Sequence, residues 1–301
     1  MSTRIIVHGG AGEIPIEDCE AHLSGCRTAA AVGWEVLRSG DSALDAVEAA
    51  VTVLEDDPVF DAGRGSYLNT DGHVEMDAII MDGHDLNLGA IVGVRTVRYP
   101  ISLARHVMES TPHNMFAGPG AEALANGFGL ERCEPAWFVT PYTRRVWEEG
   151  HAKTTQFGTV GCVARDRDGN IATGTSTGGI RNKITGRIGD SPLVGCGAYA
   201  DNNAAGVSAS GQGEAIMKVV LSKTACELVL AGMSAQAAAQ AAIETLRDRT
   251  GGKGGLIVID HRGDLGCACN TLRMSHAWVD DVGQIQAEIE PSDQIADHLS
   301  P

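Results

Sequence analysis

The chain has few aromatic and few basic residues, and each shortage limits what it can do. Phe, Trp and Tyr make up 4% of its 301 residues, so the core must be built mainly from Ala, Val, Ile and Leu. Lysine and arginine together number 23 against 39 aspartates and glutamates, giving a net charge of -16. Because nucleic acids and anionic membranes attract positive charge, this balance argues against both as partners.

The sequence also lacks the residue spacings of metal, redox and membrane proteins. Its 8 cysteines include no CxxC pair and its 10 histidines no HExxH spacing, so we expect reduced, buried cysteines and no catalytic zinc. The first residues do not have the pattern of a signal peptide, and no apolar run approaches the roughly 18 residues of a membrane span. A cytoplasmic location is therefore the default expectation.

The first part of the chain reads as one strand followed by two helices. Its length suits either one large α/β domain or two smaller ones. Apolar spacing predicts a short buried strand over 4–10 and a long helix over 16–40. A second helix is expected over 43–56, where Ser42 and Asp45 form an S-x-x-D capping signature.

The rest of the chain alternates strand-like and helix-like runs. Before the middle of the chain, we expect strands within 66–83, around a turn at 71–72, and within 86–97, followed by helices over 101–110 and 120–129. We then expect an exposed linker over 141–156 and a hairpin over 159–177 that turns at 168–169. The remaining elements are helices over 214–233, introduced by 208–213, and over 235–252, capped by Ser234, and strands within 254–271 and 274–280. This order predicts sheets stacked between helical layers.

Thr159 begins the predicted hairpin, and its role is the central question. A β-branched residue there is typical of an ordinary strand. Two features favour another role: the polar segment immediately upstream, and the hydroxyl-rich cluster TGTSTGG (173–179) that ends the partner strand. A threonine freed at its amino end carries a base in its own α-amine, whose reference pKa is about 7.7 to 8.0. Gly158 is the residue type that best permits the strained backbone needed for such a cleavage.

An ordered set of motifs carries a family resemblance that covers nearly the whole chain. The motifs are HGGAG (8–12), GTVG (158–161), TSTGG (175–179), GRIGDSPLVG (186–195) and GQGE (211–214), supported by DPVFDAGRGSYLN, EMDAIIMDG, YADN and GGLIVID. In this order they resemble the plant-type L-asparaginase and isoaspartyl peptidase family. Those enzymes are N-terminal-nucleophile hydrolases that use threonine as the nucleophile.

The resemblance implies an α+β fold of the four-layer αββα sandwich type, formed by a single domain over 1–301. It implies self-cleavage between Gly158 and Thr159 into an α chain (1–158) and a β chain (159–301), and assembly as a dimer of processed αβ units. The implied reactions are hydrolysis of L-asparagine to L-aspartate and ammonia, and hydrolysis of β-aspartyl dipeptides. No organic cofactor is implied.

Carried over by position, Thr159 is the nucleophile, and Thr177 hydrogen-bonds and orients it. Taken alone, Thr177 would be a strand-end hydroxyl that caps a glycine turn. Arg187 can hold the α-carboxylate of a substrate bidentately, while Asp190 accepts from its α-ammonium group. Without the family, this arginine and aspartate would be interpreted as a solvated surface pair.

Ser210 and Gly211 match the positions that stabilise the oxyanion, although Ser210 also suits a helix N-cap. Many members have threonine at Ser210. The larger departure is Asp61, where the family pattern F-N-A-G has asparagine. Because an ionised carboxylate only accepts hydrogen bonds, Asp61 could slow self-cleavage or shift its pH dependence, or it could pair with the α-ammonium group of Thr159 or with Arg64.

The resemblance further implies a structural sodium ion held by backbone carbonyls in the loop 54–64. The matching positions are Leu54, Glu55, Asp57, Phe60, Ala62 and Arg64. The glycines of 8–12 do not form a nucleotide site, because they lack both the P-loop lysine and the G-x-G-x-x-G spacing. In the family this loop lies near the active site and aids processing.

Three other functions stay open at this stage. A glycosylasparaginase usually has a secretory or periplasmic address, which we do not find in this sequence. A specific threonine endoprotease needs an extended substrate groove. The third is an unprocessed, single-chain binding protein in which Asp61 has silenced cleavage, and a denaturing gel separates it from the hydrolases.

Overall fold

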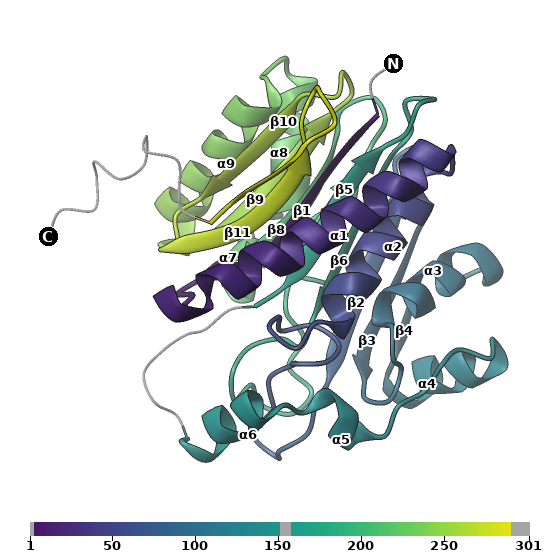
Figure 1. Cartoon of the computed structure of the whole chain (residues 1–301), viewed down its shortest axis with the longest axis vertical. Coiled ribbons are helices and arrows are strands. Elements are labelled where there is room, and N and C mark those ends of the chain that lie inside the picture. Colours follow the sequence, from purple (N-terminus) through teal and green to yellow (C-terminus); the bar gives the residue numbers. More distant parts are fainter. Residues whose placement is uncertain (1–2, 151–157, 290–301) are drawn as a thin grey trace, which may run out of the picture.

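The computed structural model describes residues 3–150 and 158–289, where it shows a mixed α/β architecture built on two sheets (Figure 1). The larger sheet has the strand order β12-β11-β1-β5-β6-β2-β3-β4, and the smaller has the order β10-β9-β8-β7. The larger sheet comprises β1 (Arg4–Gly12), β2 (Met76–Asp82), β3 (Leu88–Val94), β4 (Met115–Ala117), β5 (Val160–Arg165), β6 (Ile171–Thr177), β11 (Arg273–Val279) and β12 (Ile285–Glu288). The smaller comprises β7 (Ala198–Ala200), β8 (Ala205–Gly211), β9 (Gly254–Asp260) and β10 (Leu265–Cys269).

Helices pack on the outer faces of both sheets (Figure 1). Those against the larger sheet are α1 (Cys19–Ser39), α2 (Ala43–Asp56), α3 (Pro100–Ser110) and α4 (Gly118–Gly127), and those against the smaller are α8 (Leu221–Leu230) and α9 (Ala235–Thr250), with α7 (Gly213–Val219) beside them. The remaining helices are the 3-10 turn η1 (Ile16–Asp18), α5 (Pro135–Phe138) and α6 (Pro141–Glu148). Within residues 3–150 and 158–289, every helix is too short or too polar to cross a bilayer.

The core follows the alternation of side chains along each strand. On β1, Ile5 and Val7 are buried in the cluster under the helices of the larger sheet. Ile6 points to the opposite face and packs in a different cluster, with Ile257 and Ile259 of β9. The two sheets therefore face each other across an apolar layer, and the larger sheet is buried on both faces near β1.

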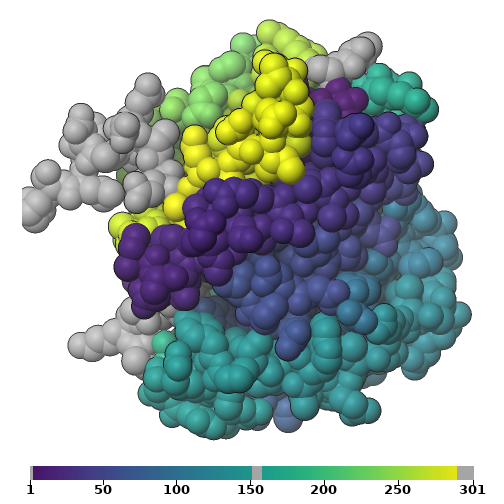
Figure 2. Space-filling model, in the orientation of Figure 1, coloured from purple at the N-terminus to yellow at the C-terminus, as the bar shows by residue number. Residues whose placement is uncertain are grey.

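Helix α1 crosses one face of the molecule, between β11 and β12 on one side and α2 on the other (Figure 2). Gly33 makes this close packing feasible, because a Cβ atom there would lie 2.4 Å from the Ile5 side chain and 3.0 Å from the Ala46 carbonyl oxygen. At the start of α2 the expected capping box is confirmed. The Ser42 hydroxyl accepts from the Asp45 N–H, and the Asp45 carboxylate accepts from the Ser42 N–H.

The predicted hairpin over 159–177 is confirmed as β5 and β6, paired in antiparallel register. The prediction of a linker over 141–156 was wrong at its start, because residues 141–148 form α6. Thr140 and Thr143 form a capping box for this helix, and the Trp147 indole donates to the Asn69 carbonyl at 2.9 Å. Residues 151–156 of that prediction lie outside the described part of the chain.

Three further predictions need correction. Residues 208–211 do not introduce a helix, because they end β8, and the N-cap of α7 is Gln212. The single helix expected over 214–233 is two helices, since Val220 adopts a left-handed backbone with φ 48° and ψ 55°. The β-type run before β2 forms only an isolated bridge between Leu68 and Val74. Strands β4, β7 and β12 and helix α5 were not predicted.

Candidate active site

Thr159 immediately precedes β5 and lies beside Thr177, the last residue of β6. The register explains the meeting, because Val160 pairs with Ser176. Thr159 is buried, and its Oγ1 lies 2.5 Å from the Gly158 carbonyl oxygen and 3.2 Å from Thr177 Oγ1. The hydroxyl is thus held against the peptide bond that joins it to Gly158.

The orientation of the Thr177 hydroxyl follows from its neighbours. The Gly179 N–H donates to Thr177 Oγ1 at 2.8 Å, and Thr177 Oγ1 donates to the Gly158 carbonyl oxygen at 3.0 Å. A hydroxyl has one proton to donate and lone pairs to accept with, so both bonds can form together. Thr177 therefore places a hydrogen-bond donor on the Gly158 carbonyl.

Asp61 packs directly against the cleavage site. A Cβ atom added to Gly158 would lie 2.3 Å from Asp61 Cβ and 3.0 Å from Asp61 Oδ2. Asp61 Oδ1 accepts from the Tyr67 N–H at 2.8 Å, whereas Oδ2 has no hydrogen-bond partner in the described chain. Burial raises the pKa of this carboxyl well above its ordinary value, although Lys183 and Arg187 oppose the shift.

The expected alternative pairing of Asp61 with Arg64 does not form within the described residues. The Arg64 guanidinium lies instead over the Trp137 ring, 5.6 Å from its centroid. The buried cation near Asp61 is Lys183, which sequence reasoning missed. Its Nζ donates to the Glu75 carbonyl oxygen at 2.6 Å. Nothing in the local sequence distinguishes Lys183 from an ordinary surface lysine.

Arg187 and Asp190 converge at the start of α7, although they lie on an irregular loop. A Cβ atom built on Gly213 would lie 2.8 Å from Arg187 Nη2 and 2.9 Å from Asp190 Oδ1. Asp190 is buried, and its Oδ2 has no hydrogen-bond partner in the part of the chain that the structure describes. Burial raises the pKa of Asp190 to about 7, while Arg187 opposes this shift. A cation and a carboxyl group therefore meet over a glycine that leaves room beside them.

The guanidinium of Arg187 already has an internal partner, Glu214. Its Nε and Nη2 donate to the two Glu214 oxygens, each at 2.9 Å. This pairing lowers the pKa of Glu214, which is more than half exposed. Sequence reasoning noted the GQGE motif but gave Glu214 no role. A glutamate in the first turn of a helix that follows a loop with a candidate carboxylate-binding arginine was the signal that could have indicated the Arg187–Glu214 pair.

Ser210 and Gly211 end β8, so the interpretation of Ser210 as a helix N-cap was wrong. Ser210 is fully buried, and its Oγ accepts from the Ala11 N–H at 3.0 Å, which leaves the hydroxyl proton free for another partner. Gly211 has φ 149° and lies so close to Gly254 that an added Cβ atom would be 2.4 Å from the Gly254 Cα. These contacts tie the end of β8 to β1 and β9.

The loop 54–64 has the donor set that a hard cation takes, namely backbone carbonyls. The Leu54 carbonyl has no i+4 helical partner, because residue 58 is proline and has no N–H. The Glu55 carbonyl accepts from the Arg64 N–H at 2.7 Å, and each carbonyl keeps a second lone pair. Two carbonyl oxygens of this loop, those of Leu54 and Glu55, therefore have lone pairs available for a cation. Among the described residues, no three His, Cys, Asp or Glu side chains gather as a metal site.

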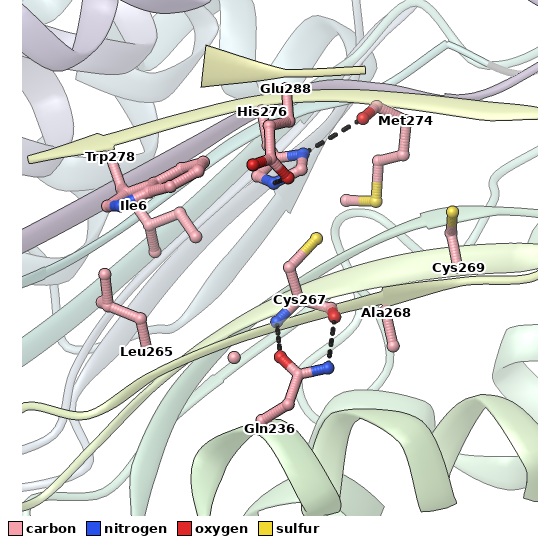
Figure 3. A pocket seen from close by; sticks show the side chains of 11 residues that line it. Ile6, Gln236, Leu265, Cys267, Ala268, Cys269, Met274, His276, Trp278 and Glu288 are labelled. Atoms are coloured by element: carbon pink, nitrogen blue, oxygen red, sulfur yellow. Dashed lines mark hydrogen bonds and ion pairs between the residues drawn. The ribbon is translucent and has the colours of Figure 1, made fainter. Parts of the chain in front are cut away.

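Two cavities differ in their relation to these residues. One of about 460 Å³ is lined by Gly10, Asp61, Tyr67 and Gly158 among others, and so borders the cleavage site. The other, of about 340 Å³, lies between β10 and β11 (Figure 3) and contains none of the candidate residues. There the Gln236 side-chain amide bonds to the Cys267 N–H and carbonyl, which occupies those edge groups of β10.

The chain is similar to proteins of one family over nearly its whole length. The sequence model of a family described as "Asparaginase" matches residues 1–289. The chain is 44% identical over 302 residues to the isoaspartyl peptidase/L-asparaginase of Homo sapiens, covering 97% of this chain and 98% of the relative. It is 43% identical over 281 residues to the protein of that name from Danio rerio, covering 91% of each. It is 44% identical over 298 residues to a plant-type L-asparaginase from Pyrococcus abyssi, covering 91% of this chain and 95% of the relative.

Proposed function

Because the chain belongs to the asparaginase family, we propose that it is a threonine hydrolase that converts L-asparagine to L-aspartate and ammonia and hydrolyses β-aspartyl dipeptides. The observation that carries this proposal is the cluster at Gly158. There the Thr159 hydroxyl touches the preceding carbonyl, and Thr177 donates to the same oxygen. The names of the relatives support both substrate classes.

The first step is self-cleavage. Thr159 Oγ1 attacks the Gly158 carbonyl carbon, and the hydroxyl proton passes to the Thr159 nitrogen as the C–N bond breaks. The two residues are then joined by an ester. The hydrogen bond from Thr177 Oγ1 stabilises the negative charge on the carbonyl oxygen during this attack. Water then hydrolyses the ester, which gives an α chain ending at Gly158 and a β chain beginning at Thr159 with a free α-amine.

The freed amine is the base for the second reaction. It takes the proton of the Thr159 hydroxyl, whose oxygen attacks the side-chain carbonyl carbon of the substrate. Ammonia, or the amino group of the leaving amino acid, departs with that proton, and water hydrolyses the acyl-enzyme. The Ser210 hydroxyl proton and the backbone N–H of Gly211 are the oxyanion donors in this scheme.

Arg187 and Asp190 bind the aspartyl head group. The arginine pairs with the α-carboxylate, and the substrate competes with Glu214 for its guanidinium. The carboxylate of Asp190 accepts from the α-ammonium group, and the nearby positive charge favours its ionised form. Since both substrate classes present the same aspartyl head group, they differ only in the leaving group, which is ammonia or an amino acid.

The rest of the expected architecture belongs to the same proposal. The two sheets with helices on their outer faces form the αββα sandwich of N-terminal-nucleophile hydrolases, as one domain over 1–301. The processed αβ units pair as a dimer in the cytoplasm, with neither nucleic acid nor membrane as a partner. The carbonyls of the loop 54–64 hold a structural sodium ion, and no organic cofactor takes part.

An activity assay tests the proposal. Purified protein is given L-asparagine, a β-aspartyl dipeptide or the matching α-aspartyl dipeptide, and released ammonia or amino acid is measured. We expect hydrolysis of the first two substrates and none of the third, and no activity for Thr159→Ala. Hydrolysis that persists in this variant would contradict the assignment of the nucleophile.

A further inference from the structure

Three buried polar side chains form a line of hydrogen bonds between the larger sheet and the smaller one. It consists of His8 on β1, Ser208 on β8 and Thr175 on β6, each with no exposed surface. His8 Nε2 lies 2.8 Å from Ser208 Oγ, which lies 2.7 Å from Thr175 Oγ1. Thr175 Oγ1 in turn donates to the Gly197 carbonyl oxygen at 3.0 Å. Polar side chains buried this completely must be hydrogen-bonded, and each of these three is.

The contacts set the direction of every hydrogen bond in the line. Burial lowers the pKa of His8 to about 3, so the imidazole is neutral and carries one N–H. The Gly10 N–H donates to His8 Nδ1 at 3.3 Å, which places the ring proton on Nε2. His8 therefore donates to Ser208, Ser208 donates to Thr175, and Thr175 donates to the Gly197 carbonyl.

The two ends of the line lie at the two halves of the candidate active site. At one end, Gly10 donates its N–H to His8 and packs against Thr159, because a Cβ atom on Gly10 would lie 3.2 Å from both the backbone nitrogen and the carbonyl oxygen of Thr159. At the other end, the Gly197 N–H donates to the Asp190 carbonyl oxygen at 3.0 Å.

The close approach of the sheets at this line depends on a glycine. A Cβ atom on Gly161 would lie 2.0 Å from Ser208 Oγ and 2.5 Å from His8 Nε2. No other residue type could occupy this position without displacing the hydrogen bonds. The absence of a side chain at Gly161, close to Thr159, therefore leaves the space that the His8–Ser208 hydrogen bond occupies.

We propose that His8, Ser208 and Thr175 are positioning residues that fix the backbone at Thr159 relative to the loop that carries Asp190. The inference rests on the proposed function, in which Thr159 attacks a substrate whose head group is held by Asp190. A misplacement of about 1 Å between reacting groups can cost about 100-fold in rate. A fixed line of hydrogen bonds between the two halves prevents such a shift.

Thr175→Val tests the proposal, since it removes the hydroxyl and keeps the shape. Thr173→Val is its matched control, because Thr173 is equally buried on the same strand and donates to the Cys162 and Val207 carbonyls outside the line. With L-asparagine and processed enzyme, we expect Thr175→Val to lower kcat at least about tenfold and to raise KM. We expect Thr173→Val to stay within about threefold of the parent, and Thr175→Ser to recover most of the loss.

Equal losses of kcat in the two valine variants, in proportion to their losses of Tm, would overturn the proposal. So would a fully active, normally processed Thr175→Val enzyme, which would leave the proposed function intact. Conversely, if the parent protein has no hydrolase activity at all, the proposed function fails first. These outcomes are therefore distinguishable.

A second measurement needs no activity. The nitrogen chemical shifts of ¹⁵N-labelled histidine, assigned to His8 by comparison with His8→Asn, report which ring nitrogen carries the proton. We expect the Nε2–H form throughout the pH range in which the protein is folded, because burial keeps His8 neutral. An Nδ1–H form or a ring that titrates near neutral pH would refute the line as described. Among variants, we expect His8→Gln, whose amide can replace the Nε2 donor, to retain more kcat than His8→Asn.

Discussion

Replacing Asp61 with asparagine tests how the cleavage site is assembled. The Asp61 carboxyl is buried against Gly158, and one of its oxygens has no partner among the described residues. Burial raises its pKa well above the ordinary value, which favours the neutral acid, a group that can both donate and accept. Once ionised it only accepts, and it places negative charge beside a carbonyl that must itself become negative.

The ionisation of Asp61 sets the direction and size of the change in self-cleavage rate. Self-cleavage of the parent should slow as pH rises through the raised pKa of Asp61, because the neutral fraction falls about tenfold for each further pH unit. The asparagine side chain does not titrate and can donate at every pH. We therefore expect Asp61→Asn to be cleaved faster than the parent above the pKa of Asp61, by a factor that grows about tenfold per pH unit, and to approach the parent rate at low pH.

The assay is the fraction of uncut chain against time, measured by intact mass under denaturing conditions on freshly translated protein between pH 5.5 and 9. Asp57→Asn is the control, because Asp57 lines the same cavity and its pKa is also raised by burial. Its carboxylate caps the Val59 N–H at 3.1 Å and does not lie against Gly158. Identical pH profiles for the parent and Asp61→Asn, or a parent rate that rises with pH, would refute the reasoning.

Three further predictions concern the substrate-binding groups and are each checked by steady-state kinetics with L-asparagine. Because the pKa of Asp190 is raised to about 7, KM should rise as pH falls through that value, and Asp190→Asn should have a high KM that no longer depends on pH in this range. Arg187→Lys should raise KM by about tenfold or more, because lysine cannot make the bidentate pair; an unchanged KM would exclude it as the carboxylate-binding group. Glu214→Gln should change KM by less than about fivefold, since its ion pair with Arg187 is partly exposed and worth at most about 1 kcal/mol, and a larger change would show that Glu214 contacts the substrate.

Local sequence signals predicted the elements that define the centre of the fold. The apolar run of residues 5–7 before two glycines marks β1, and the S-x-x-D signature at Ser42 marks α2. The hairpin over 159–177 was predicted from its turn, whereas the contact between Thr159 and Thr177 was expected only from the family resemblance. The signals failed where tertiary contacts decide, as in α6, whose polar sequence is held by Trp147 against the Asn69 carbonyl.

The contacts between distant segments could not be predicted from the sequence without the family resemblance. Arg187 and Asp190 lie on an irregular loop, and only the folded chain shows that they meet over Gly213. Lys183 has no local signal, although it lies close enough to Asp61 to influence its ionisation. The contact between His8 and Ser208 joins residues 200 positions apart, a separation at which periodicity and spacing carry no information.

The proposed function requires that Thr159 is freed as a new N-terminus, which can be measured directly. Intact mass of the purified protein is recorded under denaturing conditions and followed over days, and any fragment is sequenced from its N-terminus. We expect the parent protein to give two fragments, one of which begins Thr-Val-Gly-Cys. We expect Thr159→Ala to keep a single intact mass. A parent protein that keeps a single intact mass would contradict the claim and would favour an unprocessed binding protein of this fold.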